Sequence, residues 1–212
     1  VGFAGIRLSR VSSLVIGGGI TEKIHFKNLN FGIFSNVSNL IVENCKFKDI
    51  LNYDPGYPRG RFSGTGIYCE SKATLNELTQ TGDNDNLDAD FDNCLTGILT
   101  MQTGLRISEN QMRNVDIGIR SLHANYAKIY IERNNIDCNS VGVSLIDNDK
   151  VLIMDVLGNT IHAGNRSSTI LGNTSHTLGI DVADNNTNLT SAVKRINDNI
   201  IYLHEYGRIG LH

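Results

Sequence analysis

Short stretches of alternating apolar and polar residues recur along the chain. Residues 105–107 (Leu-Arg-Ile) and 129–131 (Ile-Tyr-Ile) each place an apolar side chain at every second position, and Asn110 and Asn134 follow three residues later. A period of two indicates strands with one face turned inward. Stretches this short need to pair with their equivalents one repeat further on, at a spacing of about 4.8 Å. The pattern therefore predicts short strands that stack on one another.

Glycine followed by an apolar residue closes each copy of the pattern. Gly97, Gly118 and Gly142 stand 21 and 24 residues apart. This period is typical of solenoids and is too short for a unit that returns through a long helix. Leucine is too sparse for a leucine-rich repeat, and a β-sandwich would not repeat Asn and Gly at fixed offsets. We expect one all-β domain over 1–212, a parallel β-helix of about eight coils. The chain opens mid-pattern, as a fragment of a longer chain would.

Asparagine is unusually frequent, with 25 residues. Asn and Gly both tolerate a positive φ, which suits tight corners. Stacked Asn side chains can bond the Asn above and below, so the sequence predicts a structural ladder at one corner of the coils. Its predicted members are Asn28, Asn44, Asn93, Asn110, Asn134, Asn159 and Asn199. Alternation also predicts that Ile107, Ile131 and Ile153 form one interior column.

Charge and cysteine content narrow the class of protein. The net charge is −3 with an isoelectric point near 6.1, and no basic face is visible, so a nucleic-acid partner is not expected. The longest apolar runs are too short to span a membrane. Without a Cys-x-x-Cys pair, buried free thiols are favoured over disulfides or a zinc site. The four cysteines are Cys45, Cys69, Cys94 and Cys138.

With these repeats, the chain resembles the right-handed parallel β-helix repeat family, the pectin-lyase-like superfamily, over roughly residues 24–212. The resemblance implies an extracellular or cell-surface location and a possible polysaccharide partner. The catalytic signatures of its polygalacturonases and pectate lyases are absent. Residues 208–210 (Arg-Ile-Gly) match only part of one polygalacturonase motif, and residues 58–61 (Pro-Arg-Gly-Arg) do not match the pectate lyase motif. Fold does not settle function, so whether the chain is an enzyme stays open.

Insertions in a solenoid map to loops, often around a binding face. Three are expected, near 51–65, 70–86 and 162–178, and the first and last fall at the same place in the repeat. If the stack is regular, these two wall a groove about 20 Å wide. The candidate substrate-binding residues are Tyr57, Arg59, Arg61, Arg106, Arg120, Tyr130, His162 and Arg166.

The charged side chains of the outer faces admit two interpretations. In a lyase, Arg106 or Arg120 would act as the base. In the alternative, Asp90, Arg106 and Glu132 pair across neighbouring coils as a simple charge ladder, and this interpretation is favoured. Leu152 and Met154 are also expected to face outward, as a stalk would require.

One acidic run is a candidate Ca²⁺ site. It lacks the Gly and the terminal Glu of an EF-hand loop, so neither a metal nor a cofactor is predicted. Its members are Asp83, Asp85, Asp88, Asp90 and Asp92. The leading hypothesis for function is a non-catalytic or scaffold segment of a secreted or surface protein. Its candidate partners are polysaccharide and the neighbouring coils or domains of a longer chain. The alternatives are a polysaccharide lyase or glycoside hydrolase acting in the groove, and a tailspike or adhesin stalk.

Overall fold

The computed structural model is built from parallel strands in two sheets. It describes residues 2–11, 13–18, 23–36, 39–51, 62–71, 77–82, 90–124, 126–148, 151–164, 177–183, 193–204 and 209–211. One sheet has seven strands: β2 (Ser13–Gly17), β4 (Asn39–Glu43), β7 (Glu77–Thr81), β10 (Gly104–Ser108), β12 (Lys128–Glu132), β14 (Ile153–Leu157) and β17 (Val193–Asn197).

The other sheet has twelve strands. They are β1 (Gly2–Ser9), β3 (Ile24–Asn36), β5 (Cys45–Ile50), β6 (Thr65–Glu70), β8 (Phe91–Cys94), β9 (Thr96–Met101), β11 (Gln111–Leu122), β13 (Asn135–Ile146), β15 (Thr160–Ala163), β16 (Leu178–Ala183), β18 (Ile200–Leu203) and β19 (Ile209–Leu211). Among the described residues, no helix is long and apolar enough to cross a membrane.

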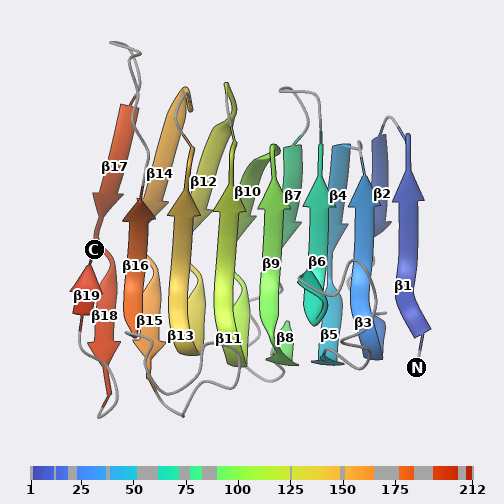
Figure 1. Ribbon diagram of the computed structural model, residues 1–212, viewed down its shortest axis with the longest axis horizontal. Helices are drawn as coiled ribbons and strands as arrows, with labels where there is room; N and C mark the ends of the chain where they lie inside the picture. The colour runs from blue at the N-terminus through green and yellow to red at the C-terminus, as the bar shows by residue number, and fades with distance from the viewer. Residues whose placement is uncertain are drawn as a thin grey trace.

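Each strand inside the stack pairs with its equivalents one repeat earlier and one repeat later, and the strands at the two ends of the stack pair on one side. Figure 1 shows the strands side by side along the long axis, from β1 near one end to β17 and β19 near the other. In the seven-stranded sheet the order β17-β14-β12-β10-β7-β4-β2 is the chain order in reverse, and each connection between neighbours passes through strands of the other sheet. The expected all-β stack of parallel strands is confirmed, and its arrangement is that of a β-solenoid.

The interior of the seven-stranded sheet forms a column of apolar side chains. Ile107 pairs with Ile131, and Ile131 pairs with Val156. All three are fully buried. The predicted place of Ile153 in this column is wrong, because it lies at the start of β14 and pairs with Lys128. Val156 takes the position instead.

Phenylalanine rings stack inside the N-terminal half of the twelve-stranded sheet. The ring of Phe47 lies between those of Phe26 and Phe91, with centroids 4.9 and 4.8 Å away and planes within 8° of parallel. The same row continues through Met112 and Ile136. Rings in neighbouring strands fall at this separation because it is the spacing of the strands themselves.

The recurrent glycines stack where the twelve-stranded sheet bends. A Cβ on Gly118 would come within 2.5 Å of the carbonyl oxygen of Gly142 and 2.7 Å of the Ile136 side chain. Gly97 and Gly142 meet the next coil in the same way. These three glycines do not have positive φ. Close approach of neighbouring backbones, and not a left-handed corner, therefore explains their repeat.

A strand occupies part of the predicted insertion near 70–86. β7 pairs with β4 and β10, so that Leu78 matches Leu105 and Gln80 matches Ile107. Phe91, which follows this segment, begins β8 in the other sheet and pairs with Met112. β7 was missed because Thr79 and Gln80 interrupt its apolar alternation.

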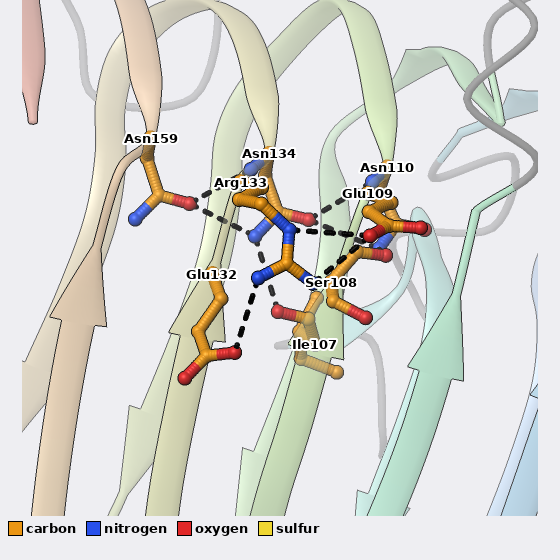
Figure 2. A network of polar contacts seen from close by, with 8 residues as sticks. All are labelled: Ile107, Ser108, Glu109, Asn110, Glu132, Arg133, Asn134 and Asn159. Atoms are coloured by element: carbon orange, nitrogen blue, oxygen red, sulfur yellow. Dashed lines mark hydrogen bonds and ion pairs between the residues drawn. The ribbon is translucent and has the colours of Figure 1, made fainter.

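Four asparagines form a hydrogen-bonded ladder at one corner, and Figure 2 shows three of them, Asn110, Asn134 and Asn159. Asn110 donates to the Oδ1 of Asn134 from both its backbone N–H and its Nδ2, at 3.0 Å each. Asn134 donates to Asn159 in the same way, and Asn159 to Asn199. The second Nδ2 hydrogen of Asn134 reaches the Ile107 carbonyl at 3.1 Å. The ladder thus joins four successive coils.

The assignment of Asn28, Asn44 and Asn93 to this ladder is wrong. Asn44 has φ 51° and directly precedes Cys45, just as Arg133, with φ 53°, precedes Asn134. The left-handed corner residue is therefore the neighbour of the ladder residue and not the ladder residue itself. Asn28 and Asn93, with φ 56° and 54°, lie at a further corner, where Asn93 donates to Asp49 at 2.8 Å.

All four cysteines are free and buried, as predicted. Desolvation raises the pKa of the Cys45 and Cys69 thiols to about 11 and that of Cys94 to about 12, and it raises the pKa of Cys138 as well. These thiols are apolar core groups at neutral pH.

Candidate functional site

The outer face of the seven-stranded sheet carries the most polar chemistry among the described residues. Alternation turns every second side chain of β10, β12, β14 and β17 away from the interior. Arg106, Tyr130, Asp155 and Arg195 follow one another in register across these four strands. We call this row the outer stripe.

An arginine and a tyrosine meet in the outer stripe. The guanidinium carbon of Arg106 lies 4.1 Å from the centroid of the Tyr130 ring, which is the geometry of a cation–π contact. Arg106 is also 3.9 Å from Glu77 on β7, and both side chains are exposed. The predicted candidates Arg106 and Tyr130 are thus brought together by neighbouring strands.

An ion pair between the exposed Arg195 and the buried Asp155 continues the outer stripe. Arg195 donates to both carboxylate oxygens of Asp155, at 2.8 Å from Nε and 2.5 Å from Nη2. Hydrogen bonding to Asp155 raises the pKa of Arg195. Asp155 is only 3% exposed although it faces outward. The predicted outward position of Met154 is wrong: Met154 is buried in the core, because β14 begins at Ile153 and shifts the alternation by one residue.

A second set of charges lies beside the Asn ladder. Arg133 contacts Glu109 at 2.9 Å and Glu132 at 3.7 Å, as Figure 2 shows. The predicted pairing of Asp90, Arg106 and Glu132 is wrong, since each has a different partner. Charged side chains of neighbouring coils do form ion pairs, but which residues pair depends on the strand register, which the sequence alone did not show.

Arg120 and His162 lie on the twelve-stranded sheet and so do not share a face with Tyr130. Arg120 is half-buried and follows Phe34, Tyr68 and Leu99 in register. These three side chains are 3%, 4% and 2% exposed and form a second apolar cluster on the side of the sheet opposite the main core. The ring of Phe62 also stacks on Tyr68. This row does not provide an open floor for a sugar chain.

Other candidates fall outside the described residues. They are Tyr57, Arg59, Arg61 and Arg166, together with Asp83, Asp85 and Asp88 of the acidic run. The two described members of that run are paired with lysines: Asp90 lies 3.1 Å from Lys46 and Asp92 lies 3.1 Å from Lys48. Across the part of the chain that the structure describes, no group of three or more His, Cys, Asp or Glu side chains is placed to hold a metal ion.

Sequence reasoning missed Asp155 and Arg195. The signal was present: the interior column has its apolar residue three positions before each ladder asparagine, as in Ile131 and Asn134. Counting back from Asn159 gives Val156 and places Asp155 outward. No family model matches the chain, and the searches of curated proteins and of solved structures found no match either.

Proposed function

We propose that the chain is a rigid scaffold segment of a secreted or surface protein, built as a right-handed parallel β-helix of about eight coils. The observation that carries this proposal is the unbroken Asn ladder, in which each buried amide binds the coil before it and the coil after it. A buried polar group that loses its partner costs about 1–3 kcal/mol. Bending or shearing the stack would break several such bonds at once, so the segment would hold its two ends at a fixed separation.

The distance between the two ends tests rigidity directly. Ser13 and Val193 are exposed and occupy the same row on β2 and β17, which are six strand steps apart. At about 4.8 Å a step, spin labels on Ser13→Cys and Val193→Cys should give one narrow distance distribution near 30 Å. The native thiols are buried and have raised pKa values, so labels should attach only at the introduced sites. A broad or bimodal distribution would overturn the scaffold proposal.

Polysaccharide binding is the second candidate function, and the pairing of Arg106 with Tyr130 favours it. A guanidinium grips a uronate carboxylate with two parallel bonds, and a tyrosine ring stacks on the C–H face of a sugar. Both groups lie on an outer face, and Arg106 is 46% exposed. The outer stripe is therefore the binding surface for this function.

Calorimetry with polygalacturonate and with alginate tests this second function. Binding should fall at least tenfold in the double variant Arg106→Ala with Tyr130→Ala. The matched control is Arg133→Ala, which removes an exposed arginine of the same sheet edge. Equal loss in the control would indicate nonspecific charge attraction, and formation of unsaturated sugar products by the wild type would favour a lyase.

A further inference from the structure

Two histidines from successive coils meet on the outer side of the twelve-stranded sheet. His162 lies on β15, and His204 follows β18 on the next coil. Nδ1 of His162 lies 3.4 Å from Nε2 of His204, and the latter side chain is exposed. No sequence motif marks this pair, because 42 residues separate its members.

The distance between these nitrogens suits two chemistries to different degrees. A hydrogen bond between nitrogen and its acceptor is usually about 2.9–3.0 Å long. Two ligands of a tetrahedral ion with metal–nitrogen bonds of about 2.0–2.1 Å lie about 3.3–3.4 Å apart. The observed separation of 3.4 Å fits the metal geometry better.

Neighbouring residues fix the His162 ring and the His204 backbone, whereas the His204 ring can rotate. The His162 ring stacks on Tyr202, its register partner, with centroids 4.5 Å apart and planes at 14°. The backbone N–H of His204 donates to the Ala163 carbonyl at 3.0 Å. The two imidazole planes differ by 22°, so convergence of their lone pairs requires a turn of the exposed His204 ring. That torsion is soft.

A carboxylate shares the row of His162. Asp137 on β13 is its register partner in the preceding coil, one strand spacing away. Its carboxylate favours the binding of a cation beside it. Among the described residues, however, no three His, Cys, Asp or Glu side chains lie close enough together to form a complete metal site. Two imidazole ligands, with water in the remaining coordination positions, form a weak site for a metal ion of intermediate softness.

We propose that His162 and His204 bind one divalent transition-metal ion, Zn²⁺ or Cu²⁺, through Nδ1 and Nε2. The ion bridges β15 and β18 and so fastens the last coils to each other. This matters for the solenoid because the final strands are the least covered: Ile196, which continues the interior column, is 39% exposed, and Ile200 is 53% exposed.

Metal titration of the whole chain tests the proposal. With Cu²⁺, one equivalent should bind, and its electron paramagnetic resonance spectrum should show coupling to two ring nitrogens. His162→Gln and His204→Gln should each lower the affinity for Zn²⁺ at least tenfold, whereas the control His25→Gln, an exposed histidine of β3, should leave it unchanged.

Hydrogen exchange separates this site from other metal-binding groups of the chain. Zn²⁺ should slow exchange of the β15 and β18 amides at least threefold in the wild type, and it should not do so in His204→Gln. Equal affinity for Zn²⁺ in the wild type and in the double variant His162→Gln with His204→Gln would overturn the proposal. Zn²⁺ protection confined to other strands would overturn it as well, and the pair would then be only hydrogen-bonded.

Discussion

The same corner of the solenoid is built differently in its N-terminal and C-terminal halves. Phe47 pairs with Phe91, and Phe91 pairs with Met112. Cys45, two residues before Phe47, therefore occupies the position that Asn110 holds two residues before Met112. One half places a thiol at the corner, and the other half places an amide there.

The Cys45 thiol and the Asn110 amide each donate a hydrogen bond within their own coil, but they differ in the hydrogen bonds that they can make with the next coil. The Cys45 thiol donates to the carbonyl of Glu43 at 3.4 Å, and Nδ2 of Asn110 donates to the carbonyl of Ser108 at 2.8 Å, each two residues back. Only the amide has a strong oxygen acceptor and a second donor for its neighbours. The N-terminal half is stabilised instead by the phenylalanine stack. The same corner position is thus filled by a thiol in one half and by an amide in the other.

The largest expected effect is at the centre of the ring stack. Phe47→Ala should lower the free energy of unfolding by about 3–5 kcal/mol, because it removes a buried ring between two others and leaves a cavity. Urea titration measures this. Phe47→Leu is the control and should cost less than half as much, because it retains most of the apolar volume. An equal loss in both variants would show that stacking geometry, and not volume, stabilises this half.

Asn134→Ala should come next, at about 2–3 kcal/mol, because amide groups of Asn110 and Asn159 and the Ile107 carbonyl lose partners in a buried site. The matched control is Asn135→Ala, which changes the exposed neighbour of Asn134. Its free energy of unfolding should lie within about 0.5 kcal/mol of the wild-type value. Urea midpoints of the two variants measure the difference. If the two midpoints coincide, the Asn ladder is not the main polar interaction that stabilises the C-terminal half.

Cys45→Ala should cost only about 1 kcal/mol at pH 7, since one weak donor and a little apolar volume are lost. The difference should then shrink as the pH rises. The folded-state pKa of Cys45 is raised from 9.0 to about 11, so between these values the unfolded thiol ionises while the folded one does not. Wild-type stability therefore falls relative to the variant between pH 9 and 11. A constant gap across that window would contradict the burial of this thiol.

The smallest effect is expected on the outer stripe. Arg106→Ala should change the free energy of unfolding by less than about 0.5 kcal/mol, because its contacts are exposed and solvent-screened. Thermal melts at low and high salt measure this. A loss above 1 kcal/mol would mean that the outer stripe supports the fold, which would weaken its interpretation as a binding surface.

The sequence predicted the fold better than it predicted the candidate site. Alternation and the spacing of Gly97, Gly118 and Gly142 predicted parallel stacked strands, because these signals arise within one coil. Arg106 and Tyr130 were identified as outward neighbours on the same grounds. His204, Asp155 and Arg195 were missed, because their partners lie 40 or more residues away and the intervening loops differ in length.

By itself the sequence determined which residues turn inward within each regular strand and that equivalent strands stack at short intervals. It also determined that the thiols are buried, because the apolar face of an alternating strand in a stacked sheet packs into the core. Only the tertiary structure decided which residue of one coil lies above which residue of the next. A shift of one residue moves a side chain to the other face, as Met154 shows, and backbone pairing between coils fixes that register.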